Sequence, residues 1–389
     1  MGFKFSILSF IFINFSSISL GEDFLESLSD SAPKNTMVST STLLPIPSTL
    51  VEIRDIKANE VPKPQPQKEV KKENIKRYEE PVHVLSLDFS SPQVDMKEII
   101  DGGVVLDEIP ALVDPATILI PVAEKNHYYT DDEYMAVIEI NGDARAYPLR
   151  ILNWHQGVNA EIGGQPIFMA YDPLSANIFA MDRRVYAGKE PFFGVTGQVY
   201  RSTSIYYDKA TKSTWSPYEN KAITGLLSGT RMKRYEAMLT TWKSYKEAYP
   251  EGKVMDLMNT GYERNYRQNP YGNYARNSQI LFPVAYTNRA LPKKEYVVGV
   301  RLYKGSKHIE VAIPINVILS HESSRIEFMF DEIQVPGSRK IPVTFEVKTP
   351  TGFIEVTSPD SDVVIEKSYG FWFAWSAHNP KSRVVTSLK

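Results

Sequence analysis

The fold is decided by the stretch MAVIEINGDARAYPLRILNWHQGVNAEIGGQPIFMAYDPLSANIFAMDRR, residues 135–184. Asn-Gly at 141–142 lies between two apolar runs and predicts a tight hairpin, because both residues tolerate a positive φ. Pro148 can occupy the first position of a helix. The apolar residues after it predict a short helix that ends near Trp154 and His155.

The second part of this stretch predicts a strand between two turns. Gly-Gly at 163–164 is the first turn, residues 167–171 read as the strand, and Asp172-Pro-Leu-Ser175 closes it with turn residues. Short apolar runs separated by turn residues continue along most of the chain, and few segments are long enough for a helix. This pattern predicts an α+β fold that is predominantly antiparallel β with few short helices.

Two later segments carry clear local signals. Residues 239–249, LTTWKSYKEAY, predict a helix that ends at Pro250. In the tail, residues 369–380, YGFWFAWSAHNP, alternation predicts a strand with Phe371, Phe373 and Trp375 on one buried face.

A pattern of turn, aromatic and charged residues runs through the chain from residue 107 to residue 380. Its members are Arg145, Tyr147-Pro148, Asn153-Trp154-His155, Gly163-Gly164, Pro173-Leu174, Asp182-Arg183, Phe193-Gly194-Val195-Thr196-Gly197, Tyr207-Asp208, Gly261, Arg264, Pro270-Tyr271, Phe282-Pro283 and Phe371-Trp372-Phe373-Ala374-Trp375. With these residues the chain resembles a bacterial exported family catalogued as domain of unknown function 3179. The resemblance implies a shared fold, but the family name assigns no activity.

The chain departs from that family at its polar positions. The family typically has Trp-His-Glu where this chain ends the same motif with Gln156, and Cys-Pro-Leu-Cys where this chain has Asp172 and Ser175. The Asn and Asp of the family's Tyr-Asn-Ser-Asp segment correspond to Arg201 and Thr203. The resemblance therefore implies a retained fold with an altered or lost site.

Composition excludes several classes of site. The chain has 389 residues, a net charge of −2 and no cysteine. Without cysteine there are no disulfides, thiolate zinc sites, iron–sulfur clusters or cysteine nucleophiles. The folded part has no strong basic block, which argues against nucleic acid as a partner.

The N-terminal region divides into two segments. Residues 1–21 read as a signal peptide, with an apolar core at 7–15 and a small-x-small pattern at 19–21; a membrane anchor is the alternative, but the apolar run is short. Residues 22–95 are rich in Ser, Pro and Lys and read either as a disordered linker or as an unselected tail. We expect residues 96–389 to form one globular domain that is periplasmic, cell-surface or secreted.

A repeat relates two parts of the chain. Residues 146–155 align without gaps on 312–321, which places His321 opposite His155. Units of about 133–172 and 295–348 would each be a hairpin, a short helix begun by proline and a return strand. A diverged duplication is the hypothesis, and chance similarity of two hairpins is the alternative.

The candidate site residues cluster in residues 135–184. The catalytic candidates are His155, Asp172, Asp182 and Arg183, and the binding candidates are Arg145, Trp154 and Ser175. We expect Asp172 to pair with Arg183 or Arg145, or else with His155. Asp172 and Ser175 could also support acid–base work or bind a hard cation with His155, Asp182 and His378.

Some features remain open on the sequence alone. Residues 264–274 are rich in Tyr, Asn and Arg and could either wrap the core or line a binding groove. His127 lies in a polar loop, where a solvated histidine is commoner than a metal ligand. No phosphate loop, dinucleotide fingerprint or nucleophile elbow is present, and the sequence names no cofactor and assigns no metal ligand.

Two hypotheses of function follow. The first is an exported, non-catalytic binding or scaffold protein with a dismantled polar site and an unknown ligand or protein partner. The second is an extracytoplasmic enzyme or metal-binding protein with a site remodelled around His155, Asp172 and Arg183.

Overall fold

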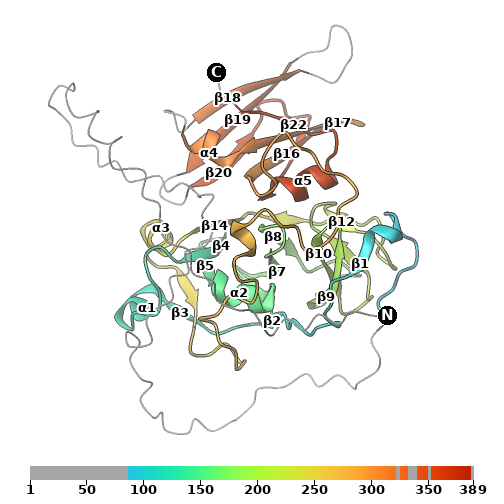
Figure 1. The fold of residues 1–389 in the computed structure, drawn as a ribbon. Helices are drawn as coiled ribbons and strands as arrows, with labels where there is room; N and C mark the ends of the chain where they lie inside the picture. The colour runs from blue at the N-terminus through green and yellow to red at the C-terminus, as the bar shows by residue number, and fades with distance from the viewer. Residues whose placement is uncertain (1–85, 321–324, 332–339, 349–351, 387–389) are drawn as a thin grey trace, which may run out of the picture. The chain divides into compact units, whose positions relative to one another are not determined.

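Most of the residues seen in the computed structural model of the chain are in β-strands or the turns between them (Figure 1). The structure describes residues 86–320, 325–331, 340–348 and 352–386. In these ranges the strands form five sheets, and the helices are few and short. Most strand pairs are antiparallel, so the predicted predominance of antiparallel β structure with few short helices is confirmed.

Two of the sheets contain a hairpin followed by a helix. The first has the hydrogen-bonded order β14 (Ala237–Thr241), β4 (Tyr134–Ile140), β5 (Asp143–Pro148), β15 (Lys253–Met255), β3 (Thr117–Leu119). The second has the order β21 (Val363–Phe371), β16 (Tyr296–Lys304), β17 (Lys307–Pro314), β22 (Arg383–Val384). In the first sheet β5 pairs parallel with β15, and in the second β17 pairs parallel with β22.

The other three sheets are antiparallel except for the pair β2–β6. One has the order β13 (Arg234–Tyr235), β8 (Asn177–Asp182), β7 (Gln165–Asp172), β6 (Gly157–Ile162), β2 (Leu112–Val113). Another has the order β1 (Ile99–Asp101), β9 (Phe193–Tyr200), β10 (Thr203–Asp208), β11 (Thr214–Ser216), β12 (Lys221–Ala222). The last has the order β18 (Arg325–Asp331), β19 (Lys340–Lys348), β20 (Phe353–Thr357).

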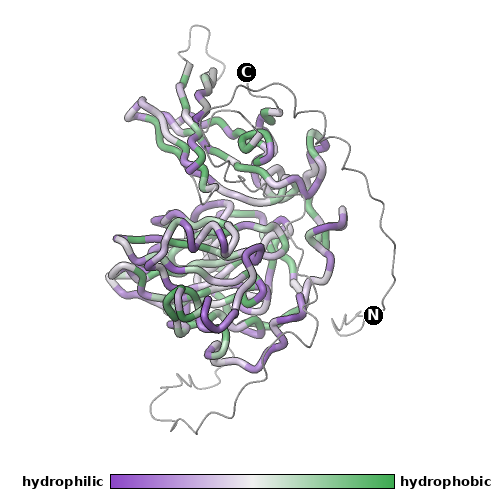
Figure 2. Tube along the Cα trace, turned by 90° about the vertical axis from the view of Figure 1, so that its left-hand side faces the viewer, coloured by the Kyte–Doolittle hydropathy of each residue, from purple (hydrophilic) through white to green (hydrophobic). Residues whose placement is uncertain are grey.

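The helices each occupy one or two turns. They are α1 (Ile120–Lys125), α2 (Leu149–His155), α3 (Trp242–Ala248), α4 (Ile315–Leu319) and α5 (Trp372–His378), with 3₁₀ turns at Met96–Glu98 and Tyr274–Arg276. Hydrophobic residues follow the strands into the interior, and hydrophilic residues gather at the outer turns (Figure 2). Helices this short are held by packing rather than by their own propensity.

The predicted hairpin forms where the sequence places it. Asn141 and Gly142 have φ of 52° and 84°, and they join β4 to β5 with Ile140 opposite Asp143. Such a two-residue turn needs positive φ at both positions, which Asn-Gly tolerates. Pro148 ends β5 and α2 begins one residue later, at Leu149.

Two predicted elements differ from the structure. The helix expected at 239–249 begins only at Trp242, because Thr241 ends β14 and its hydroxyl accepts the Ser244 amide at 3.2 Å. In the tail, the prediction of one strand is wrong: β21 stops at Phe371 and the aromatic residues continue into α5. Every residue of α5 is buried, as expected for these side chains, and a helix buried all round shows no apolar stripe in its sequence.

The described part begins before the expected boundary at residue 96. Asp88 forms a β-bridge with Ser213, and the Gln93 amide donates to the Ile223 carbonyl at 2.8 Å. The structured chain thus reaches back at least to Ser86. The predicted signal segment 1–21, the linker up to residue 85, and His321 lie outside the described residues.

Candidate functional site

The turn after β7 is the centre of a buried polar cluster. Asp172 ends the strand, Ser175 lies in the turn, and Ser204 lies on β10; their exposed fractions are 2%, 0% and 5%. The Ser175 hydroxyl donates to Asp172 Oδ2 at 2.5 Å, and the Ser204 hydroxyl donates to Oδ1 at 2.8 Å. The Leu174 and Ser204 amides add bonds of 3.1 and 3.2 Å. Gln156, at the end of α2, lies beside this turn, since its carbonyl accepts from the Tyr171 amide at 3.0 Å. We call these residues the Asp172 cluster.

The partners of Asp172 are not the expected ones. Burial raises its pKa, and the hydrogen bonds from Ser175, Ser204 and Leu174 oppose that rise. Within the described part of the chain, neither Arg145, Arg183 nor His155 donates to this carboxyl. The expectation of a cationic partner is therefore wrong; hydroxyls and amides take its place.

Gln156 stands where the family has glutamate. It caps α2 in the left-handed region, with φ of 56°, and its Nε2 donates to the Tyr271 hydroxyl at 2.7 Å. Its Oε1 and the hydroxyl of Tyr206 are buried without a hydrogen-bond partner among the described residues. Buried polar atoms are normally paired, so these two mark an incompletely satisfied region beside Asp172.

A covering segment, residues 264–274, closes over this region. Its contacts are hydrogen bonds from Trp154 Nε1 to the Gln268 carbonyl (3.0 Å), between His155 Nε2 and the Tyr266 hydroxyl (2.7 Å), from Gln156 Nε2 to the Tyr271 hydroxyl (2.7 Å), and from the Tyr274 hydroxyl to the Leu174 carbonyl (3.0 Å). Of the two uses that the sequence left open, the segment wraps the core. It encloses α2 and the Asp172 turn from one side.

His155 is fully buried and has a partner at each ring nitrogen. Nδ1 lies 2.8 Å from the Pro110 carbonyl, which can only accept, so Nδ1 carries the proton and Nε2 accepts from Tyr266. Burial, together with the charge of the nearby Arg264, lowers the pKa of His155 to about 4, and the hydrogen bond to Pro110 opposes this shift. This histidine is a neutral, hydrogen-bonded structural residue.

His378 takes part in an arrangement with the residue types of a catalytic triad. Its Nδ1 lies 2.9 Å from Glu219 Oε1 and its Nε2 lies 3.2 Å from the hydroxyl of Thr203. The Glu219 carboxylate can only accept, so Nδ1 carries the ring proton. The Thr203 hydroxyl donates to the Tyr200 carbonyl at 2.7 Å, so its proton is directed away from Nε2. In a catalytic triad the nucleophile's proton is directed at the base, and here it is not.

The remaining candidates serve local structure. Arg183 donates to the carbonyls of Ile167 at 3.2 Å and Glu190 at 2.9 Å, and it lies over the Phe192 ring. Arg145 pairs with Asp143 at 2.7 Å.

Asp182 lies at the end of β8. Burial alone would raise its pKa, but hydrogen bonds from Arg184 and Lys233 hold the pKa below its usual range. The Tyr235 hydroxyl also donates to it at 3.2 Å. It is fully engaged, and it makes no contact with the Asp172 cluster among the hydrogen bonds of the described residues.

The described residues hold no group of three or more His, Asp or Glu side chains arranged to bind a metal ion. His127, the loop candidate, is exposed. In the same residues no helix is long and apolar enough to cross a membrane.

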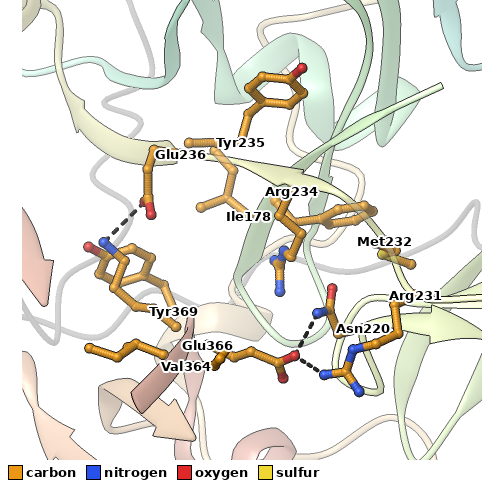
Figure 3. Close-up of a pocket in the computed structure, with 14 residues that line it drawn as sticks. Ile178, Asn220, Arg231, Met232, Arg234, Tyr235, Glu236, Val364, Glu366 and Tyr369 are labelled. Atoms are coloured by element: carbon orange, nitrogen blue, oxygen red, sulfur yellow. Dashed lines mark hydrogen bonds and ion pairs between the residues drawn. The ribbon is translucent and has the colours of Figure 1, made fainter. Parts of the chain in front are cut away.

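The sequence did not predict a cavity of about 320 Å³ between β13 and β21. The Arg234 guanidinium points into it, and Glu366 and Glu236 lie on either side (Figure 3). In the sequence, Arg234 is one basic residue of several in the run 231–236, and nothing there sets it apart. Only the pairing of β13 with β8 shows which of these side chains faces the cavity.

Comparison with known proteins places these features in a family. A family model described as protein of unknown function, DUF3179, matches residues 106–382, a range that includes the Asp172 cluster, the covering segment and the Arg234 cavity. No curated protein and no solved structure matches the chain. The comparison supports the resemblance seen in the sequence and assigns no activity.

Proposed function

The chain belongs to the DUF3179 family, and we propose that it is a non-catalytic binding or scaffold member whose polar site has been dismantled. The observation that carries the proposal is the Asp172–Ser175 contact. By the resemblance, Asp172 and Ser175 correspond to the two cysteines of the family pattern. The Ser175 hydroxyl donates a hydrogen bond to the Asp172 carboxyl at 2.5 Å. With Ser204 and Leu174 also donating, Asp172 has no free lone pair directed at a ligand.

The two buried histidines support the same proposal. His155 donates a hydrogen bond from Nδ1 to the Pro110 carbonyl and accepts one at Nε2 from the Tyr266 hydroxyl. His378 faces the Glu219 carboxylate with Nδ1, and its Nε2 faces the Thr203 hydroxyl, whose own proton is donated to the Tyr200 carbonyl. Both rings are buried, and each of their nitrogens lies against a group of the protein itself.

Export is part of the proposal. It is supported by the sequence of residues 1–21 alone, with its apolar core and small-residue cleavage pattern. The protein would act in the periplasm, at the cell surface or in the medium.

We further propose that the two hairpin-containing sheets descend from one duplicated unit. In both, a proline with extended backbone precedes the helix: Pro148 has φ −64° and ψ 134°, and Pro314 has φ −54° and ψ 133°. The parallel pairs also fall at the aligned residues, with Val254 opposite Ala146 and Val384 opposite Ala312.

A second helix in each sheet adds support beyond the hairpins. The amides of Trp242 and Trp372, the first residues of α3 and α5, donate to the carbonyls of Glu133 and Glu295, both at 2.8 Å. The turn of the second hairpin falls at residues 305–306. An experimental structure that resolves His321 tests the duplication: the proposal expects residues 312–321 to superpose on 146–155, with His321 on His155, and a divergent path would overturn it.

Metal content tests the proposed function most simply. The purified full chain, His155→Ala and Asp172→Asn are dialysed, and their metal is measured by mass spectrometry. We expect substoichiometric metal in all three. Stoichiometric metal that either substitution removes would overturn the proposal and favour an enzyme or metal-binding protein remodelled around His155, Asp172 and Arg183.

A further inference from the structure

We propose that the cavity between β13 and β21 binds a small organic carboxylate with an apolar body, and that Arg234 holds its carboxylate group. Arg234 lies on β13 and pairs through its backbone with Met181 of β8. In Figure 3 its guanidinium reaches the middle of the cavity. This inference rests on the reading of the chain as a binding protein and supplies the class of ligand.

Arg234 is a half-buried cation without an ion pair to a carboxylate among the described residues. Its one hydrogen bond there is a long one, 3.5 Å, to the Ser368 hydroxyl, and its other neighbour is the Phe179 ring at 5.6 Å. Burial lowers the pKa of Arg234 to about 10, which still leaves the guanidinium charged at neutral pH. A half-buried guanidinium with unused donors is well suited to a carboxylate, which it can bind through two parallel hydrogen bonds.

The other charges around the cavity are already paired. Glu366 accepts hydrogen bonds from Arg231 and from Asn220, the latter at 3.0 Å. Lys367 pairs with Glu236 at 3.0 Å. These pairs cancel, so Arg234 leaves the cavity with one net positive charge, which matches a monoanion.

The walls determine the rest of the ligand. Ile178, Phe179, Met232, Ile365 and Tyr369 are among the lining residues, but most of them are largely buried, and polar side chains supply the larger share of the cavity surface. A volume of about 320 Å³ lies at the lower end of ligand cavities, which span roughly 300–1,000 Å³. A compact aromatic or aliphatic carboxylate would occupy this volume and reach its apolar edges, whereas an inorganic anion would fill only part of it.

The cavity has an accessible mouth. Val364, and the side chains of Arg231 and Glu236, are 61%, 58% and 64% exposed. Arg234 lies deeper, between the two strands. A ligand can therefore enter carboxylate first.

The test uses the full chain and three probes: benzoate, its uncharged analogue benzamide, and inorganic phosphate. Binding is measured by calorimetry and by the rise in melting temperature. Arg234→Gln removes the proposed contact. Arg234→Lys keeps the positive charge but cannot donate two parallel hydrogen bonds to one carboxylate. Lys233→Gln is the matched control, since it removes a cation one residue away whose side chain is 68% exposed and faces Asp182.

We expect benzoate to bind and benzamide and phosphate to bind far more weakly. Arg234→Gln should weaken benzoate binding by about tenfold or more, Arg234→Lys by less, and Lys233→Gln should match the wild type. Benzoate binding that Arg234→Gln leaves unchanged, or binding of phosphate alone, would overturn the inference; so would no binding of benzoate.

Failure of this inference is distinguishable from failure of the proposed function. If benzoate does not bind and the protein carries no metal, the proposal of a non-catalytic binding protein stands, but its ligand is not a carboxylate of this class. Stoichiometric metal at His155 or Asp172 would overturn the proposed function whatever benzoate does. Should Arg234→Gln fold poorly, the contrast between benzoate and benzamide on the wild type, together with Arg234→Lys, still decides.

Discussion

The Asp172 cluster and the Arg234 cavity are each centred on one ionisable side chain, fully buried in the first and half-buried in the second, and the protein satisfies the two differently. Asp172 is 2% exposed and accepts four hydrogen bonds from its own turn and from β10. Arg234 has one long hydrogen bond, to Ser368, and faces a cavity with an open mouth. Among the described residues the first charge is completed by the protein and the second is not. A ligand is needed at the second place and has no role at the first.

The Asp172 cluster and the proposed ligand cavity lie in different parts of the structure. The covering segment 264–274 is hydrogen-bonded to His155, Gln156 and Leu174, beside positions at which the chain departs from the family pattern. The cavity lies elsewhere, between strands that are far apart in the sequence. On our proposal, binding depends on the junction of β13 and β21 rather than on the Asp172 cluster.

The largest expected effect is on stability at the Asp172 turn. Asp172→Ala leaves four buried donors without an acceptor and should lower the free energy of unfolding by roughly 3 kcal/mol. Denaturant unfolding measures this, with the exposed Asp132→Ala as control. A loss no larger than that of the control would mean that the Asp172 cluster does not stabilise the fold. The Asp172 cluster and the Arg234 cavity would then not differ as described.

His155 should make the protein sensitive to acid. Its pKa is lowered to about 4 by burial, so the unfolded chain takes up a proton first as the pH falls below about 6.5. The stability present above that pH is lost on the way to about pH 4, on the order of 3 kcal/mol for the full shift. His155→Asn should flatten this dependence, whereas the exposed His308→Asn should not; equal curves for both variants would contradict a buried neutral His155.

Asp172→Asn sharpens the account of the Asp172 cluster. Because burial raises the pKa of Asp172, the wild type has its full contribution at low pH and loses it as the pH rises through the folded-state value. The melting temperature of Asp172→Asn relative to the wild type should therefore increase as the pH rises above about 4, the unfolded-state value of an aspartate. A constant difference would show that the carboxyl ionises as freely in the folded protein as in the unfolded chain.

The smallest effect concerns Arg234 in the ligand-free protein. Removing a half-buried cation that lacks an ion pair should leave stability unchanged or raise it by about 1 kcal/mol in Arg234→Gln. Arg301 is the contrast, because it donates to Asn379 Oδ1 and to the Tyr218 carbonyl, both at 2.6 Å. Arg301→Gln should destabilise the protein, and chemical denaturation of both variants compares them; an equal loss would mean that Arg234 is already satisfied.

The sequence predicted the parts of the fold that depend on short-range signals. Asn141-Gly142 specifies its turn through backbone conformation alone, and the strand at 167–171 lies within β7. The tail was misassigned because α5 is buried all round and its aromatic residues fit a strand as well as a helix. Where β21 ends and α5 begins, the Trp372 amide donates to the Glu295 carbonyl, and these two residues are 77 positions apart in the sequence.

The candidate site was predicted only in part. Proximity in sequence correctly gathered Asp172 and Ser175, because a turn brings them together. It could not supply Ser204, which arrives from β10, or the covering segment, which approaches His155 and Gln156 from more than a hundred residues downstream. Arg234 was missed for the same reason: its partners are defined by tertiary packing, and its neighbours in sequence are also basic.

The most direct measurement is a crystal structure of the full chain soaked with 4-bromobenzoate, with the bromine located by its anomalous signal. The account predicts one bromine site between β13 and β21, with the carboxylate on the Arg234 guanidinium and the Asp172 turn unchanged. A bromine site inside the Asp172 cluster, or none in the cavity of a crystal whose Arg234 is accessible to solvent, would contradict it.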